Sequence, residues 1–597
     1  MSNDQTVIEE LPPADSVTAA VEHIAEASHA AIEKFLNKRE HSPWRNMDPL
    51  GLGEAFLQLT SRLMTDPHPL LKAQHDLWSA YARIWQNTAL SFMGMPGAAH
   101  VPVPQGDKRF KHDDWENNPF FAFLKQSYLV TASTLQTMVS DVDGLDEKTA
   151  RKIEFYTKQF ADAIAPTNFA LTNPEVLRTT VETGGANLLN GLRNFLADLD
   201  PETGQLRTRM TDVNAFELGR NVATTPGKVV FQNRMMQLLQ YSPSTTEVYR
   251  RPLLIVPPWI NKFYILDLQP KNSFIKWAVD QGHTVFVMSW INPDESLAEQ
   301  DFRDYMMEGP LAALDAIEQA TGERQVNIIG YCIGGTLLSA LLAYMKAKGD
   351  DRIVSATFFT TLLDFSDPGD LCVFIDDAQL ASLEHKMAER GYLDGSEMAS
   401  TFNMLRANDL IWSFVINNYL LGKDPFPFDL LYWNSDSTRM PAKMHSTYLR
   451  TMYLENRFCQ PGGMTVDGVP IDLRTIETPS CFIATIDDHI APWKASYQGA
   501  QLFSGPVKFI LGKSGHIAGI VNPPVSNKYG YSLGGDIHQV AADEWYTSTE
   551  GFDGSWWPAW SEWVAGFSPD MVPARQPGDG SLQVIEDAPG SYVRVRS

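Results

Sequence analysis

The period of the hydrophobic positions changes once along the chain, near residue 219. Before it, apolar residues recur at helical spacing with few β-branched runs. The helices expected from this spacing span residues 70–92, 120–139, 146–165 and 173–196. Asp146 and Asn173 are the expected N-caps of the last two, and Pro174 suits a first helical position. The pattern predicts a helical N-terminal domain over residues 45–217.

From residue 218 to 597, short apolar runs alternate with helical segments. The expected strands are residues 228–231, 236–241, 252–256, 284–289, 326–329, 353–360, 481–486 and 507–511. The helices expected between them are residues 271–281, 309–321 and 336–348. This alternation predicts an α/β domain with a mostly parallel sheet that helices cover on both faces.

One interval in this alternation is too long for a loop. Roughly 120 residues separate the strands at 353–360 and 481–486, and they contain helical patterns at 378–389, 409–421 and 442–455. We therefore expect an insertion at about residues 362–450 that caps the functional site. Its aromatic and Met residues could line an apolar acyl channel or form the core of the cap itself.

The candidate nucleophile is Cys332, in a tight turn between the expected strand 326–329 and helix 336–348. The sequence Gly330-Tyr331-Cys332-Ile333-Gly334 is typical of the strand–turn–helix elbow of α/β-hydrolases, with Cys in place of Ser. The residues two before and two after the nucleophile must be small so that the strand and helix backbones can pass closely, and both are glycine, Gly330 and Gly334. A membrane span over residues 326–345 and a merely buried cysteine are the alternatives. The internal turn argues against the first.

A cysteine nucleophile needs a base and an orienting acid, which follow it in the order acid, then histidine. Asp488 follows the strand at 481–486, and its offset from the Ile-x-Pro that comes next favours it over Asp487. His516 follows the strand at 507–511 in a Gly-His pair, so it is the expected base. His489 is the rival base, but its position beside the acid should point it elsewhere.

An oxyanion hole requires backbone N–H groups. The residue after the nucleophile, Ile333, should supply the first. The second should come from the loop after the strand at 252–256, whose first two residues are prolines without an N–H. The candidates in this loop are Trp259, Ile260 and Asn261, of which we favour the last two.

Composition narrows the class of protein. A net charge of −24 and a pI of 4.9 over 597 residues disfavour nucleic acid and anionic membranes as partners. Four cysteines without a C-x-x-C motif indicate neither a disulfide framework nor a metal site, and they fit a reducing cytoplasm. Residues 1–44 are polar and acidic, lack a secretory signal, and are expected to form a mobile tail.

A cysteine suits acyl transfer from a thioester better than it suits hydrolysis. Transfer to the thiolate conserves the bond type, so the acyl-enzyme stays activated, and attack by an alcohol then yields a more stable oxoester. The chain also resembles the class I polyhydroxyalkanoate synthases. The resemblance runs from about residue 105 to the end and is carried by residues 257–270, 330–335, 432–441, 487–489 and 514–519.

This resemblance implies that short-chain (R)-3-hydroxyacyl-coenzyme A, such as 3-hydroxybutyryl-CoA, is polymerised to a polyester. Cys332 would carry the growing chain as a thioester, and His516 would deprotonate it. Asp488 would orient His516 or activate the 3-hydroxyl of the monomer. Coenzyme A would be the acyl carrier and leaving group, with no separate cofactor. A homodimer at the surface of cytoplasmic polymer granules, without a different partner subunit, is also implied. The apolar pattern itself predicts no transmembrane segment, because nothing outside residues 326–345 resembles a membrane span.

Two other functions are compatible with the same residues. A thioesterase or depolymerase on this fold would transfer the acyl group to water, and its product would be a free hydroxyacid. In a noncatalytic granule-associated protein Cys332 would be incidental. Contacts to the phosphates of coenzyme A are open, with Lys262, Arg439 and Lys443 as candidates.

Overall fold

The computed structural model describes residues 52–66, 68–93, 95, 101–104, 106–201 and 204–596, so the predicted tail at 1–44 lies outside the described residues. The described chain forms two compact units. The first runs to Met210 and includes Arg406–Phe426, and the second holds Thr211–Leu405 and Pro427–Ser597. Residues 406–426, from within the expected insertion, thus pack with the helical unit. The domain boundaries drawn from the sequence remain predictions.

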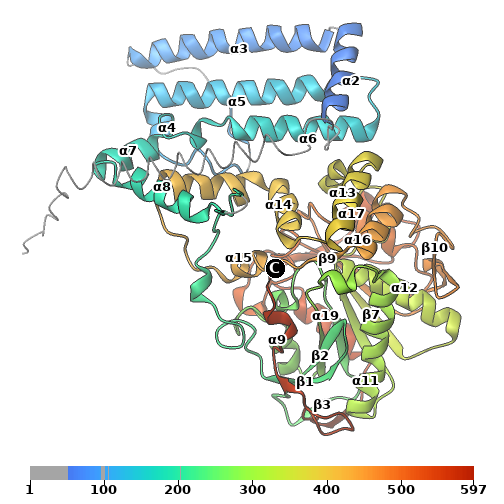
Figure 1. The fold of residues 1–597 in the computed structure, drawn as a ribbon. Helices are drawn as coiled ribbons and strands as arrows, with labels where there is room; N and C mark the ends of the chain where they lie inside the picture. Colours follow the sequence, from blue (N-terminus) through green and yellow to red (C-terminus); the bar gives the residue numbers. More distant parts are fainter. Residues whose placement is uncertain are drawn as a thin grey trace, which may run out of the picture. The chain divides into compact units, whose positions relative to one another are not determined.

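The first unit is helical, as the hydrophobic spacing predicts. Its helices up to residue 198 are α2 (Leu52–Thr65), α3 (His68–Phe92), α4 (Asp114–Asn117), α5 (Pro119–Ser140), α6 (Glu147–Ala163), α7 (Pro174–Glu182) and α8 (Ala186–Asp198). Helix α5 packs against α3 and α6, and α2 packs against α6 (Figure 1). Trp115 is 1% exposed and meets Phe110 edge-on, which anchors α4 in this unit.

The expected N-caps are in place, but the helix predicted at 173–196 is wrong as a single element. Asn173 accepts hydrogen bonds from the N–H groups of Glu175 and Val176, and so caps α7. The chain then breaks between α7 and α8. Gly184 and Gly185 adopt φ of 60° and 89°, a left-handed conformation that ends a helix and that glycine tolerates best.

The second unit is built on a mixed sheet, which has eleven strands among the described residues, in the order β15-β14-β13-β12-β7-β6-β4-β5-β2-β1-β17. These strands are β1 (Gly227–Gln232), β2 (Met236–Tyr241), β4 (Leu253–Val256), β5 (Val285–Trp290), β6 (Val326–Tyr331), β7 (Ile353–Phe359), β12 (Ser480–Thr485), β13 (Val507–Gly512), β14 (Tyr531–Leu533), β15 (Glu550–Phe552) and β17 (Glu586–Asp587). The central strands from β5 to β13 are parallel, as predicted. Both edges are antiparallel, which the sequence pattern did not indicate.

Helices cover both faces of this sheet, as expected (Figure 1). The helices on one face are α10 (Phe302–Met306), α11 (Ala312–Thr321), α12 (Ile333–Lys348) and α17 (Trp493–Ala500). Helices α9 (Phe274–Asp280) and α19 (Trp557–Ala565) pack on the other. Alternate strand residues enter the two cores, such as Leu254 on the α12 side and Leu253 on the α9 side. The central strands are therefore buried on both faces.

The segment between β7 and β12 is mainly helical, as its pattern predicts, with the short strands β8 (Tyr392–Leu393), β9 (Met440–Pro441), β10 (Met464–Val466) and β11 (Val469–Ile471). In the second unit it forms α13 (Asp377–Arg390), α14 (Gly395–Leu405), α15 (Asp429–Asn434) and α16 (Ala442–Tyr448), and α16 continues as π-helix over Leu449–Leu454. The helix expected at 409–421 is wound as two π-helical stretches, Asn408–Trp412 and Val415–Leu420. Local widening of this kind is frequent at functional sites.

The cap of α7 gives a prediction about stability. Asn173 is 4% exposed, and its Nδ2 also donates to the carbonyl of Thr167 at 2.7 Å. Asn173→Ala removes the cap and leaves a buried carbonyl without its donor, so we expect a loss of about 2 kcal/mol in chemical denaturation. Asp146→Ala, which removes an exposed cap, is the matched control and should cost about 0.5 kcal/mol. Equal losses in the two variants would contradict this account.

Candidate active site

Cys332 occupies the strained corner between β6 and α12. Its φ of 54° and ψ of −124° are unusual for any residue other than glycine. The corner is held by the backbone, because the N–H of Cys332 donates to the carbonyl of Phe359 at 2.8 Å. The Cys332 carbonyl in turn accepts from the N–H groups of Gly335 and Thr336. The helix therefore begins at Ile333, directly after the nucleophile, rather than at Thr336 as expected.

The two glycines that flank the corner are required sterically, as predicted. A Cβ on Gly330 would overlap the backbone of Gly335 on the first turn of α12. A Cβ on Gly334 would overlap the carbonyl oxygens of Val256 and Pro257, at the end of the neighbouring strand β4. These close approaches bring the start of α12 against the loop that follows β4.

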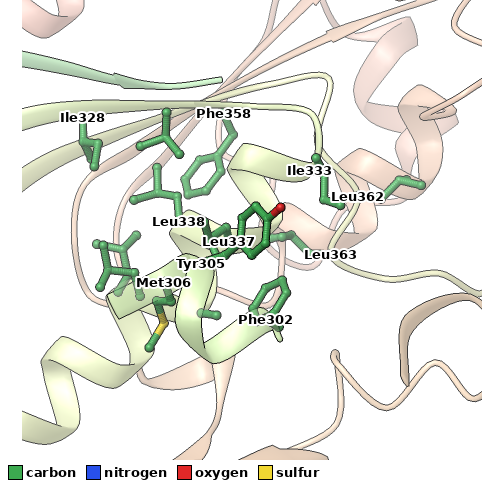
Figure 2. Close-up of a cluster of buried hydrophobic side chains, with 14 of the residues drawn as sticks. Phe302, Tyr305, Met306, Ile328, Ile333, Leu337, Leu338, Phe358, Leu362 and Leu363 are labelled. Carbon is green, nitrogen blue, oxygen red and sulfur yellow. The ribbon is translucent and has the colours of Figure 1, made fainter. Parts of the chain in front are cut away.

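Apolar packing fixes the first turns of α12. Leu337 and Leu338 are fully buried and lie beside Tyr305 and Phe358 (Figure 2). Ile333, 1% exposed, belongs to the same cluster. The N-terminus of α12 is thus held from two sides, by this core and by the elbow backbone. The first N–H groups of a helix have no acceptor within the helix. The N–H of Ile333 is one of these groups, and it is the first donor expected for the oxyanion.

Asp488 and His516 follow the neighbouring parallel strands β12 and β13, and they meet at the carboxyl edge of the sheet. His516 Nδ1 lies 2.7 Å from Asp488 Oδ2, and both residues are buried. Asp488 Oδ1 accepts from the N–H groups of Ile490 and Ala491, each at 2.9 Å. The residues after the acid thus hold its carboxylate, which explains the offset that favoured Asp488. A carboxylate only accepts, so Nδ1–H donates and Nε2 is left to act as the base.

The electrostatic environment of His516 links it to Cys332. Burial lowers the pKa of His516, because the imidazolium loses its hydration. The negative charges of Asp488 and Cys332 and hydrogen bonds to both outweigh burial, and together they raise the pKa of His516 from 6.5 to about 10. The pKa of His516 thus depends on the charges of both Asp488 and Cys332. The structure thus brings together Cys332, His516 and Asp488, and Asp488 bonds the expected base His516.

The loop after β4 lies next to this corner, and its carbonyl groups at Trp259, Ile260 and Lys262 are bonded to residues 433–438. The carbonyl of Ile260 accepts from Thr438, and Asn261 forms an antiparallel bridge with Ser437. Trp259 is buried against Tyr305, with ring centroids 4.7 Å apart. The assignment of Ile260 and Asn261 as oxyanion donors remains a prediction.

Two tyrosines near the nucleophile were not singled out from the sequence. Tyr448 and Tyr453 come from α16 and the π-helix after it, and their hydroxyls lie 3.5 Å apart. Burial raises the pKa of both, and the negative charge of Cys332 adds to each shift. They are therefore neutral hydrogen-bond donors within electrostatic reach of Cys332. A tyrosine in an aromatic segment carries no sequence signal that separates this position from ordinary core.

One candidate phosphate contact is wrong. Lys262 is 5% exposed, and its ammonium pairs with Asp436 at 2.6 Å, so a coenzyme phosphate has no access to it. Arg439 stacks over the ring of Tyr392, and Lys443 pairs with Asp301 at 3.4 Å on the surface. These two remain candidates.

The other cysteines differ from Cys332 in their surroundings. All four are free thiols, and burial raises the pKa of Cys481 to about 12, so its thiol is inert. Among the described residues, no cluster of His, Cys, Asp or Glu is placed to hold a metal ion. No helix in the same part of the chain combines the length and the apolar character that crossing a membrane requires.

Comparison with known proteins identifies the family. A model described as the N-terminus of poly-beta-hydroxybutyrate polymerase (PhaC) matches residues 106–278, and one described as the alpha/beta hydrolase fold matches residues 251–523. Poly(3-hydroxyalkanoate) polymerase subunit PhaC of Rhizobium meliloti (strain 1021) is 52% identical over 89% of this chain and 87% of its own. Poly(3-hydroxyalkanoate) polymerase of Methylorubrum extorquens is 50% identical over 89% of this chain and 88% of its own. The chain belongs to the poly(3-hydroxyalkanoate) polymerase family.

Membership confirms the resemblance noted in the sequence, the α/β-hydrolase fold and the enzyme class. As a member of this polymerase family, the chain is an acyltransferase that joins hydroxyalkanoate units into a polyester. Among solved structures, a monoacylglycerol lipase of Paleococcus ferrophilus aligns with a TM-score of 0.29 and 15% identity, over 47% of this chain and 90% of the lipase.

The raised pKa of His516 in this polymerase predicts a pH-dependent stability. A histidine whose pKa is higher in the folded than in the unfolded chain stabilises the fold below pH 6.5, and this contribution is lost as the pH rises through about 10. Asp488→Asn removes one of the charges that raise the pKa. We therefore expect the variant to melt below the parent at pH 6.5, with a gap that narrows towards pH 10.

The control for this measurement is Asp487→Asn, because Asp487 is exposed and does not bond His516. Its melting temperature should differ from that of the parent by the same small amount throughout. A gap for Asp488→Asn that stays constant from pH 6.5 to 10 would contradict the electrostatic link between Asp488 and His516.

Proposed function

We propose that this polymerase takes (R)-3-hydroxyacyl-coenzyme A, with short-chain monomers such as 3-hydroxybutyryl-CoA preferred, and carries the growing polyester as a thioester on Cys332. The observation that carries the proposal is the position of Cys332 at a strained elbow, beside the buried His516–Asp488 pair. Coenzyme A is the acyl carrier and leaving group, and no separate cofactor takes part.

In the first half-reaction His516 takes the proton of the Cys332 thiol, and the sulfur attacks the acyl carbon of the thioester. The carbonyl oxygen becomes an oxyanion, which the N–H groups of Ile333 and of Ile260 or Asn261 stabilise. The carbon–sulfur bond to coenzyme A then breaks, and protonated His516 gives the proton to the leaving thiolate. The acyl group now forms a thioester with Cys332, so its activation is conserved.

In the second half-reaction a 3-hydroxyl attacks this acyl-enzyme. His516 takes the proton of the hydroxyl, an oxoester forms, and the carbon–sulfur bond to Cys332 breaks. Asp488 orients the ring and stabilises the imidazolium in both steps. The hydrogen bonds of Asp488 support this role over direct activation of the hydroxyl, because both carboxylate oxygens are already engaged by His516, Ile490 and Ala491.

We further propose that the enzyme works as a homodimer on the surface of polymer granules in the cytoplasm. An exposed apolar stripe on α3 supports attachment to an apolar surface. Its residues repeat every seven positions and are Leu71, Trp78, Trp85 and Phe92, with exposed fractions of 59%, 72%, 63% and 70%. A stripe of this size on a helix marks an interaction surface.

The cysteine variants test the covalent route. Cys332→Ala should abolish both coenzyme A release and polymer formation from 3-hydroxybutyryl-CoA, because the acyl acceptor is gone. Cys372→Ala, Cys459→Ala and Cys481→Ala are the controls and should retain both activities when folded. Release of free hydroxyacid in place of polymer would favour a thioesterase, and full activity of Cys332→Ala would contradict the proposal.

A further inference from the structure

One threonine holds the two peptide groups of the loop that follows β4. Thr438 Oγ1 shares its one hydroxyl proton between the carbonyl of Trp259 and, at 2.9 Å, the carbonyl of Ile260. The N–H of Thr438 also donates to the carbonyl of Ile260, at 3.2 Å. Both carbonyl groups are therefore turned towards residue 438.

Because the peptide unit is planar, a bond that fixes its carbonyl also fixes the direction of its N–H group. In a trans peptide the N–H points opposite to the carbonyl of the same unit. The carbonyl of Trp259 shares its plane with the N–H of Ile260, and the carbonyl of Ile260 shares its plane with the N–H of Asn261. By fixing the two carbonyls, Thr438 fixes the directions of the two N–H groups expected to serve the oxyanion.

A buried ion pair fixes the segment that carries Thr438. The ammonium of Lys262 lies 2.6 Å from Asp436 Oδ1, and the hydroxyl of Tyr264 donates to Asp436 Oδ2 at 2.8 Å. The Lys262 ammonium also donates to the carbonyl of Val595, near the end of the chain. Lys262 and Asp436 are 5% and 3% exposed, so water weakens this pair little.

The indole of Trp433 completes the attachment. Its Nε1 donates to the carbonyl of Lys262 at 2.7 Å. Residues 433–438 thus bond the loop at three of its four carbonyls from Trp259 to Lys262, and the ion pair holds the two segments together through side chains. The steric approach of Gly334 to Val256 and Pro257 places this loop beside Ile333.

We propose that Thr438, held by the Asp436–Lys262 pair, is a positioning residue that sets the oxyanion hole of the polymerase. This inference rests on the proposed function, in which Cys332 is acylated through an oxyanion. Thr438 does not touch the substrate. It acts through the peptide groups of residues 259–261, and its loss lowers the rate of acyl transfer while the nucleophile keeps its reactivity.

The test compares two reactions of Cys332 in the full-length enzyme. Acylation by 3-hydroxybutyryl-CoA, followed as the single-turnover release of coenzyme A, develops negative charge on a carbonyl oxygen. Alkylation by iodoacetamide forms a sulfur–carbon bond and expels iodide without an oxyanion. Thr438→Val should slow acylation at saturating substrate about tenfold to a hundredfold, the range for a loosened donor. The alkylation rate of Thr438→Val should stay within about twofold of the parent's, because this reaction forms no oxyanion that the displaced N–H groups would stabilise.

Three variants complete the design. Thr438→Ser keeps the hydroxyl and should restore most of the acylation rate. Asp436→Asn breaks the ion pair and should slow acylation in the same direction as Thr438→Val. Thr321→Val removes a threonine–carbonyl bond on α11, to Ile317 at 2.7 Å, and should leave both reactions unchanged.

The outcomes separate this inference from the proposed function. Failure of the parent enzyme to acylate Cys332 would overturn the proposed function itself. A normal parent with unchanged acylation in Thr438→Val would overturn only the positioning role. Equal slowing of acylation and alkylation would also overturn the positioning role, because a general structural defect affects both reactions. So would a failure of Thr438→Ser to restore acylation, because this variant keeps the hydroxyl.

Discussion

The strained backbone at Cys332 is the constraint on which the rest of the site depends. A residue with φ of 54° between a central parallel strand and a helix persists only where its surroundings hold it. Here the Phe359 carbonyl holds the Cys332 N–H, and glycine at 330 and 334 lets β4, β6 and α12 approach closely. The strain presents the sulfur at the carboxyl edge of the sheet, beside the first N–H groups of α12. The candidate nucleophile and the expected oxyanion donor, Ile333, thus come from one local conformation.

The sheet supplies the partners of this corner. Strands β12 and β13 are parallel neighbours, so the residues after their carboxyl ends, Asp488 and His516, meet there. In the order of the sheet β7 alone separates β12 from β6, which brings the pair to Cys332. Burial and charge then couple the three groups, as the raised pKa of His516 indicates.

Local signals decided which parts of the molecule could be predicted from the sequence. The central strands, the elbow and the acid–base pair carry short motifs at fixed places, and the structure has the predicted residues together. The break between α7 and α8 was missed because apolar residues keep their helical spacing on both sides of Gly184 and Gly185. This spacing suggested one continuous helix, although two consecutive glycines favour a break. Lys262 could not be ruled out as a phosphate contact from the sequence, because its partner Asp436 lies 174 positions away. The packing of residues 406–426 with the helical unit also depends on contacts between distant parts of the sequence, so a local pattern could not predict it.

The central claim is that the acyl group passes through Cys332 as a covalent intermediate. The most direct measurement is peptide mass spectrometry of enzyme quenched during turnover with 3-hydroxybutyryl-CoA, with each cysteine-containing peptide quantified. The account predicts 3-hydroxybutyryl units on the peptide that contains Cys332, and none on those with Cys372, Cys459 or Cys481. Polymer formation with an unmodified Cys332 peptide, or acylation of another residue instead, would contradict it.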